Sequence, residues 1–323
     1  MPEPTTPTTP TPTNDRRPRR ALRRALATFV VLATLAMLGA GAWFVMQVLR
    51  FLPEERPDPP RCAVAARDGG EAAYTLQPQQ AANAATIEAV ASARGLPERA
   101  VTIALATAIQ ESTLRNLGYG DRDSLGLFQQ RPSMGWGTAE QVTDPVYAAG
   151  AFYDGLVEVP RWETMPLTEA AQAVQRSAYP DEYAGHEEEA ALLAAALTGR
   201  AGATLTCSWD EEAAPVADPA PEGDAGTVEA ELARQFGADV GAVTDGEFLS
   251  VPLEEADAAR TARGWELAHW AMAHAAELGI ERITLGDRLW EAERSQEGWQ
   301  RMSEENVASS EPGLRLSVFP AAS

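Results

Sequence analysis

Apolar residues recur at helical spacing through the central part of the chain. From Gln77 they return at steps of three and four residues until Gly95, which predicts a helix that ends at that glycine. A second helix is predicted from Pro97 to Ile109, with Glu98 favourably placed near its positive end. Because apolar residues and alanines occupy nearly the whole circumference of this second helix, we expect it to be buried on almost every side.

Similar patterns continue along the chain, separated by loops that contain glycine. Helices are predicted over residues 145–157, 168–177 and 187–197. Loops are predicted over residues 118–123 and 133–138, and the segment 126–130 between them is expected to run extended. Together these patterns predict a compact, mostly helical domain over residues 62–207.

A different alternation follows an acidic stretch. Residues 208–226 are rich in Asp, Glu, Ala and Pro, which predicts a flexible linker. Helix and strand patterns then alternate over residues 227–320, which predicts a small α+β domain. The expected elements are helices over 228–236 and 255–278, and strands over 247–252, 280–285, 288–292 and 314–319. The fold class is therefore expected to be mainly α, with a small C-terminal α+β domain.

The first 61 residues have the composition of a membrane-anchoring segment. Residues 1–24 are a Pro- and Thr-rich tail followed by an arginine cluster, and we expect the tail to be disordered. Residues 25–52 contain an uncharged run from Ala25 to Leu49, which is longer than the roughly 20 residues that a membrane-spanning helix needs. Residues 53–61 are proline-rich and predict a stiff tether.

The arginines before this run predict its orientation, with the N-terminus in the cytoplasm and the body outside it. A cleaved signal peptide is the alternative, with Ala40-Gly41-Ala42 as a small-residue cleavage site. The apolar residues continue to Leu52, beyond the about 7 to 15 residues of a signal-peptide core. We therefore expect an uncleaved single-pass anchor in the cell membrane.

Charge and cysteine content narrow the function classes. The net charge is −21, and an acidic body of this kind argues against nucleic acid as a partner. The two cysteines, Cys62 and Cys207, fit no metal or redox spacing. Outside the cytoplasm they can form a disulfide, worth about 4 to 5 kcal/mol for a loop this long. Two unpaired buried thiols are the alternative.

Glu111 lies at the exit of the helix that we expect to be buried on nearly all sides. A glutamate is rarely buried unless it is paired or takes part in chemistry, so Glu111 is a candidate catalytic acid. The alternative is a helix-end carboxylate that points into water.

Three short segments resemble the lytic transglycosylase and goose-type lysozyme group. Glu111-Ser112 is similar to the Glu-Ser signature of that group, and residues 124–129, Ser-Leu-Gly-Leu-Phe-Gln, resemble its Gly-Leu-Met-Gln segment. Ala178-Tyr179 resembles the start of its Ala-Tyr-Asn-Ala-Gly motif, although Pro180 and Asp181 then depart from the pattern. The resemblance spans about residues 77–197. It implies a lysozyme-like fold and cleavage of peptidoglycan glycan strands.

The resemblance also implies a mechanism that uses one carboxyl group. Glu111 would protonate the glycosidic oxygen as a general acid, and would then act as a base toward the sugar's own C6 hydroxyl or toward water. Most glycosidases need a second carboxylate, for which Asp121 and Asp123 are candidates. The alternative for both aspartates is a turn role around Gly120 and Ser124.

Six residues are candidates for substrate binding in this reading: Ser112, Ser124, Gly126, Gln129, Trp136 and Tyr179. Local capping is the alternative for the serines, and core packing is the alternative for the two aromatic residues. We expect no cofactor and no metal, because His269 and His274 are five residues apart and His186 lies among acidic residues.

The expected partners are peptidoglycan glycan strands and the membrane, and the partner of residues 227–320 is unknown. A non-catalytic envelope protein that binds glycan or a protein partner is the alternative function.

Overall fold

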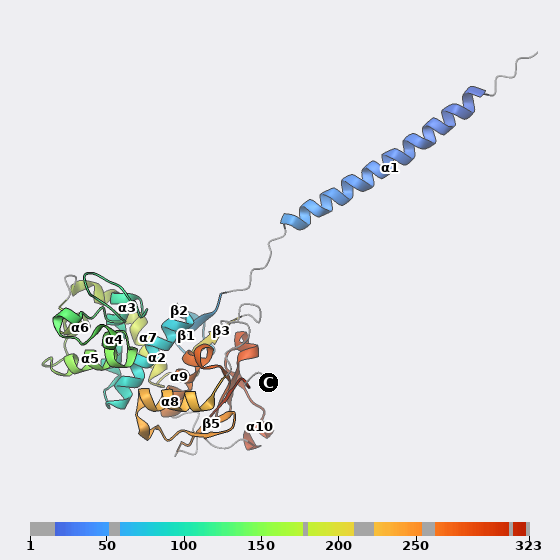
Figure 1. Ribbon diagram of the computed structural model, residues 1–323. Coiled ribbons are helices and arrows are strands. Elements are labelled where there is room, and N and C mark those ends of the chain that lie inside the picture. The colour runs from blue at the N-terminus through green and yellow to red at the C-terminus, as the bar shows by residue number, and fades with distance from the viewer. Residues whose placement is uncertain are drawn as a thin grey trace, which may run out of the picture. The chain divides into compact units, whose positions relative to one another are not determined.

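The computed structural model describes residues 17–51, 59–176, 180–209, 223–253, 262–309 and 313–320. The chain divides into two compact units, Met1–Arg56 and Pro57–Ser323. Within the described residues, helix α1 (Arg17–Phe51) belongs to the first unit, and the second contains the other helices and strands given below (Figure 1).

Helix α1 is long and apolar enough to cross a membrane. Its segment Arg23–Gln47 has a mean hydropathy of 2.1 and is 0% buried. The apolar side chains along it are exposed, as at Phe29, Leu38 and Phe44. A helix of this length and composition meets the requirement for one membrane span.

The first part of the second unit is helical, as predicted. Its helices are α2 (Pro78–Ala93), α3 (Glu98–Ser112), α4 (Ala139–Val142), α5 (Pro145–Val157), α6 (Leu167–Gln175) and α7 (Glu187–Leu197), with 3-10 turns at Pro132–Met134 and Pro180–His186. Helix α6 ends two residues before the predicted position, because Arg176 adopts a left-handed φ of 53°.

Helix α3 is enclosed by its neighbours. Every residue from Ala100 to Ile109 is buried, in agreement with the pattern of its apolar positions. The helix ends because Thr113 and Leu114 take left-handed φ angles of 53° and 58°. Two α2 side chains hold this unusual turn: Gln80 Nε2 donates to the Thr113 carbonyl at 2.7 Å, and Asn83 Nδ2 donates to the Leu114 carbonyl at 2.8 Å.

The segment 126–130 does not run extended, so that prediction was wrong. Leu125 and Gln130 instead exchange both backbone hydrogen bonds at 3.0 Å, which closes a tight loop. Gly126 and Gln129 have positive φ angles of 76° and 48° inside it. Gly126 lies so close to the Val142 carbonyl that an added Cβ would be 2.0 Å from that oxygen. Only glycine fits this turn.

A three-stranded sheet that the sequence patterns did not predict joins the two ends of this helical part. Its order is β2-β1-β3, from β1 (Arg61–Ala65), β2 (Ala72–Leu76) and β3 (Leu205–Ser208). Cys62 is the direct partner of Cys207 in the antiparallel β1–β3 register. The two cysteines form a disulfide, which confirms the predicted pairing.

The C-terminal part combines two longer helices with a sheet, as predicted. The helices are α8 (Ala225–Phe236) and α9 (Ala262–Leu278), with a short α10 (Glu304–Ser309). The six-stranded sheet has the order β4-β5-β9-β6-β7-β8, from β4 (Val243–Asp245), β5 (Phe248–Val251), β6 (Ile280–Leu285), β7 (Arg288–Glu291), β8 (Gln300–Arg301) and β9 (Leu314–Val318). Strands β4 and β8 were not predicted, because each is too short to carry an alternating pattern. The predicted start of α9 at residue 255 lies outside the described residues.

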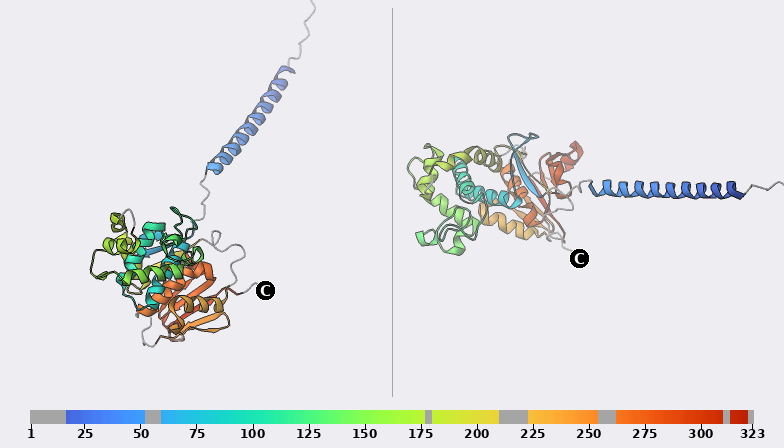
Figure 2. Two further views of the ribbon diagram at one scale, coloured as in Figure 1. Left: turned by 60° about the vertical axis from the view of Figure 1, so that its left-hand side comes forward. Right: turned by 90° about the horizontal axis from the view of Figure 1, so that it is seen from above.

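The helical part and the C-terminal part pack together within the second unit (Figure 2). Helix α9 lies against α2 and α7, and the ring of the buried His269 contacts the Ala196 carbonyl at 2.7 Å. Trp265 covers Gly202, where an added Cβ would be 2.4 Å from the indole nitrogen. Most of the predicted linker, residues 210–222, lies outside the described residues.

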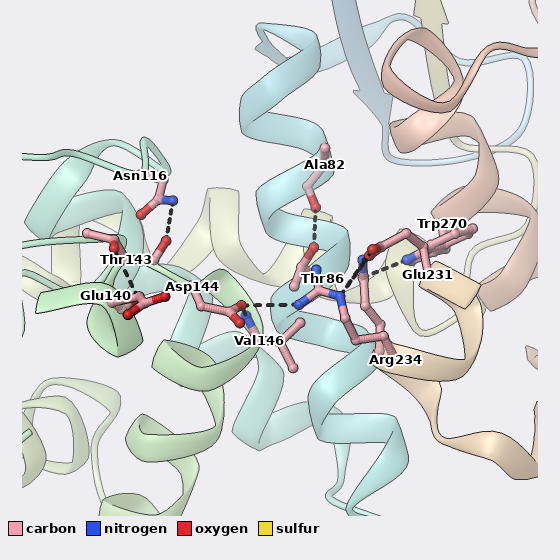
Figure 3. Close-up of polar contacts among 11 residues, drawn as sticks. Ala82, Thr86, Asn116, Glu140, Thr143, Asp144, Val146, Glu231, Arg234 and Trp270 are labelled. Carbon is pink, nitrogen blue, oxygen red and sulfur yellow. Dashed lines mark hydrogen bonds and ion pairs between the residues drawn. The ribbon is translucent and has the colours of Figure 1, made fainter. Parts of the chain in front are cut away.

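Polar contacts add to this packing at the start of α5 (Figure 3). Asp144 caps α5 by accepting a hydrogen bond from the Val146 amide at 2.9 Å. Arg234 of α8 reaches the same carboxylate at 3.1 Å and also pairs with Glu231 at 2.9 Å. Asp144, the capping residue of α5, is thus paired with Arg234 of the C-terminal part.

Candidate functional site

Glu111 lies in the last turn of α3 and is half-buried. Burial raises the pKa of its carboxyl above the ordinary value, because removal of water disfavours the charged form. Hydrogen bonds from Tyr183 and Gln175 act in the opposite direction and limit this rise in pKa. The carboxyl therefore combines a raised pKa with two fixed hydrogen-bond partners.

Tyr183 is a site residue that the sequence analysis missed. Its side chain is buried, and its hydroxyl donates to Glu111 Oε1 at 2.7 Å. It comes from the 3-10 turn Pro180–His186, four positions after the predicted Tyr179. Tyr179 itself lies outside the described residues, so its binding role stays a prediction. Tyr183 lies in the same short connection between α6 and α7 as Tyr179, and this was the one sign in the sequence that it could belong to the site.

Gln175 is the second missed residue. Its Nε2 donates to the Phe128 carbonyl at 2.7 Å, and its side chain also hydrogen-bonds Glu111. The Phe128 ring is buried and stacks on Phe152, with 4.7 Å between the ring centroids. The end of α6 therefore connects the acid to the loop that follows it in sequence.

Ser112 joins the first two segments of the resemblance. Its buried hydroxyl donates to the Leu127 carbonyl at 2.7 Å and contacts the Ala108 carbonyl at 3.0 Å. The loop is thereby held against the end of α3. These two contacts with backbone carbonyls explain the Ser112 side chain as one that positions the loop. Its predicted contact with sugar stays a prediction.

The loop around Gln129 is closely packed on itself. Gln129 Nε2 donates to the Gly126 carbonyl at 3.2 Å, and its Oε1 lies where a Cβ of Gly120 would be, 1.9 Å away. Ser124 is buried, and its amide donates to the Asp121 carbonyl at 3.0 Å. These contacts shape the loop, and the sugar-binding roles predicted for Ser124, Gly126 and Gln129 stay predictions.

The two candidate second carboxylates occupy different environments. Asp123 accepts hydrogen bonds from Arg131 Nε at 2.9 Å, from the Ser133 amide at 2.8 Å and from the Ser133 hydroxyl at 3.0 Å. These bonds hold its pKa well below the ordinary range. Asp121 is 93% exposed beside Arg122. Asp123 therefore joins its loop to residues eight and ten positions further along the chain, and not to the turn around Gly120 and Ser124 that was its alternative role.

Trp136 is half-buried and packs against the hydrophobic core. Its carbonyl accepts a hydrogen bond from the Tyr147 hydroxyl at 3.2 Å. This environment favours the packing role, and a sugar-stacking role stays a prediction.

A polar chain borders Glu111 on the side of the 3-10 turn. Gln110 Nε2 donates to Glu182 at 2.7 Å, and Gln110 Oε1 lies 2.8 Å from His186 Nε2. The other ring nitrogen of His186 faces Glu189 at 3.5 Å. His186 therefore contacts Gln110, the residue that directly precedes the candidate acid Glu111. The sequence patterns gave no reason to place His186 near this site. Across the part of the chain that the structure describes, no group of three or more His, Cys, Asp or Glu side chains is placed to hold a metal ion.

The C-terminal part of the chain matches a known family model. A family model described as the VldE C-terminal domain matches residues 238–311, which is less than a quarter of the chain. The matched segment lies within the C-terminal part and leaves the Glu111 site outside it. No curated protein matches the chain.

Proposed function

We propose that this protein is a membrane-anchored enzyme that cleaves the glycan strands of peptidoglycan, as a lytic transglycosylase or a muramidase with a lysozyme-like helical domain. The observation that supports this proposal best is the half-buried Glu111 carboxyl, with its raised pKa and its hydrogen bond from Tyr183 at 2.7 Å. A carboxyl in such an environment stays protonated at a higher pH than an exposed one, as a general acid requires.

In the proposed reaction, Glu111 donates its proton to the glycosidic oxygen as the bond to the sugar breaks. The resulting carboxylate is stabilised by the Tyr183 hydroxyl and the Gln175 amide, which both hydrogen-bond it. It then accepts a proton from the sugar's C6 hydroxyl, which closes an anhydro ring, or from water, which gives hydrolysis. Asp123 is committed to Arg131 and Ser133, which favours the version of the reaction with a single catalytic carboxylate.

The proposed location follows from α1 and the arginines that precede it. The apolar segment Arg23–Gln47 would span the cell membrane, and the arginines would keep the N-terminus in the cytoplasm. The second unit would then face the cell wall, where its substrate lies. The Cys62–Cys207 disulfide is of the kind that persists in such an oxidising compartment.

Cleavage is tested with the full-length chain in detergent on purified peptidoglycan. Mass spectrometry of the released fragments is expected to show new glycan ends with the wild type and none with Glu111→Gln. Anhydro and hydrolysed ends differ in mass by one water, so the same measurement identifies the product. Glu140→Gln is the matched control, because Glu140 is an exposed glutamate of α4, and it is expected to cleave like the wild type.

A blank trace for the wild type on every wall substrate would reject the enzymatic function. Sedimentation with insoluble wall material that survives Glu111→Gln, without any cleavage, would instead indicate a non-catalytic protein that binds glycan.

A further inference from the structure

One face of the C-terminal sheet is apolar and covered. Leu249, Leu316, Ile283 and Trp290 lie opposite one another across β5, β9, β6 and β7, and all four are buried. Helix α9 packs against β6 and β9. Because directly opposed residues share a face of a sheet, this row marks the core side.

The neighbouring rows must then point to the opposite face. One row runs through Phe248, Ser317, Arg282 and Glu291 on the same four strands. The next runs through Ser250, Arg315, Thr284 and Leu289. The strand register thereby brings Arg282 and Arg315, which are far apart in sequence, onto one face in adjacent rows.

This face forms a cavity of about 480 Å³. Arg282 and Arg315 line it together with Arg294 of the 3-10 turn that follows β7, and Glu291 is the one acidic residue among the described residues of the lining. The charges of these described lining residues sum to +2. The whole chain has 47 acidic and 26 basic residues. The cavity lining differs from the chain as a whole, because basic residues outnumber acidic ones among its described residues.

Glu291 holds two of the guanidinium groups in place. Its Oε1 pairs with Arg282 at 2.6 Å, and its Oε2 pairs with Arg294. Arg294 Nη1 also lies 4.0 Å from Glu297 Oε2. A guanidinium group carries five N–H donors, so pairing with these carboxylates leaves donors that a bound oxyanion can engage. The Arg315 guanidinium lies 5.7 Å from the centre of the Phe248 ring, which adds a cation–π contact and fixes its position.

A solvated polar face is the ordinary outcome for a sheet that is covered on one side. Such a face usually interleaves both signs of charge, whereas this one concentrates three arginines around a hollow. Apolar groups line the same cavity at Phe248, Leu289 and Met302. Arginine forks match the planar oxygens of carboxylates and phosphates, and a volume of this size suits a small organic molecule.

We propose that this cavity is a binding site for an oxyanion, a phosphate or carboxylate group carried on a small organic molecule. The three arginines would bind the anionic oxygens, and Phe248, Leu289 and Met302 would contact the apolar part. This site is separate from Glu111 and does not depend on the function proposed for that residue. It gives the C-terminal part a ligand-binding role of its own.

Arginine-specific labelling of the wild-type, full-length chain tests the proposal. The protein in detergent is treated with phenylglyoxal at low ionic strength, and labelled positions are quantified by peptide mass spectrometry. Inorganic phosphate and succinate are the two probes, with potassium chloride at matched ionic strength as the reference. Arg301 is the internal control, because it lies on the neighbouring strand β8, is 72% exposed and does not line the cavity.

The expected result is saturable protection of Arg282, Arg294 and Arg315 with unchanged labelling of Arg301. Protection by phosphate alone would identify a phosphate ligand, and protection by succinate alone would identify a carboxylate ligand. Absence of protection by either probe would overturn the proposal. Equal protection of Arg301 would also overturn it, because that pattern indicates general ion binding.

Substitutions then measure the contribution of the arginines. Arg294→Gln and Arg315→Gln, studied separately, are each expected to weaken binding of the protecting probe about tenfold or more. Arg301→Gln is expected to leave it unchanged. Circular dichroism is used to confirm that each variant is folded. If both cavity variants bind the probe like the wild type, the binding site is elsewhere.

Discussion

The Tyr183 hydroxyl donates a hydrogen bond to Glu111 Oε1 at 2.7 Å, although the two residues are 72 positions apart in sequence. One belongs to the last turn of α3 and the other to the 3-10 turn Pro180–His186. This bond lowers the pKa of Glu111, while burial raises it more strongly. The balance between these two effects sets the pH range in which Glu111 is protonated.

Tyr183→Phe is therefore expected to shift the pH dependence of the proposed glycan cleavage. Loss of the hydroxyl removes a bond that favours the carboxylate, so the pKa of Glu111 rises. A general acid with a higher pKa stays protonated to higher pH, so the basic limb of the profile is expected to move to higher pH. Cleavage rates measured across pH test this. Tyr119→Phe, which changes a tyrosine that is 74% exposed, is the control, and an unmoved limb in Tyr183→Phe would contradict the assignment.

Gly126→Ala is expected to destabilise the loop beside Glu111. The added Cβ would lie 2.0 Å from the Val142 carbonyl, and the residue would have to keep a φ of +76°. The combined steric and conformational cost is about 2 to 5 kcal/mol. Urea unfolding measures this loss. Gly118→Ala is the matched control, because a Cβ there meets nothing within 4 Å, and equal losses in the two variants would show that packing at Gly126 is not the cause.

The Cys62–Cys207 disulfide is expected to stabilise the whole second unit. It joins β1 to β3 across a sequence separation of 145. Removal of a native disulfide costs about 2 to 5 kcal/mol, so the double variant Cys62→Ser/Cys207→Ser is expected to unfold at lower urea concentration. Adding reductant should lower the stability of the wild type and leave this variant unchanged. A wild type that is insensitive to reductant would argue against the stabilising role.

The buried carboxyl Glu88 predicts a stability that falls as pH rises. It lies on α2 and hydrogen-bonds Glu266 of α9. Two effects raise the pKa of Glu88 well above 4.5: burial, which is the larger, and the neighbouring Glu266 carboxyl. Arg263, which pairs with Glu266 at 2.7 Å, opposes this rise, and the buried Tyr153 faces the same cluster.

Since the folded state holds the Glu88 proton more tightly than the unfolded chain does, its contribution is complete below about pH 4.5 and is lost as pH rises through the folded pKa. Glu88→Gln cannot ionise and should therefore show a smaller decline in unfolding free energy with pH than the wild type. Urea unfolding at a series of pH values measures both slopes. Glu140→Gln, at an exposed position of α4, should keep the wild-type slope, and parallel curves for Glu88→Gln and the wild type would exclude Glu88 as the source.

The sequence by itself determined the features that depend on neighbours along the chain. The recurrence of apolar residues at steps of three and four placed α2, α3, α5 and α7 close to their observed bounds, because helices form from local hydrogen bonds. It also placed Glu111 at the end of a fully enclosed helix. The long uncharged run identified α1, because the span of a bilayer depends only on length and composition.

Only the tertiary structure decided which distant residues meet. Tyr183 and Gln175 reach Glu111 through the packing of α3, α6 and a 3-10 turn, and no period in the sequence encodes that meeting. Arg282 and Arg315 share one face because β6 pairs with β9 in a particular register, and a shift of one residue would place them on opposite faces. Strands β1 to β3 come from opposite ends of the helical part and exist because their pairing satisfies their backbone groups. Local patterns therefore predicted most of the helices and the position of the candidate acid Glu111, while long-range pairing and packing decided which groups surround it.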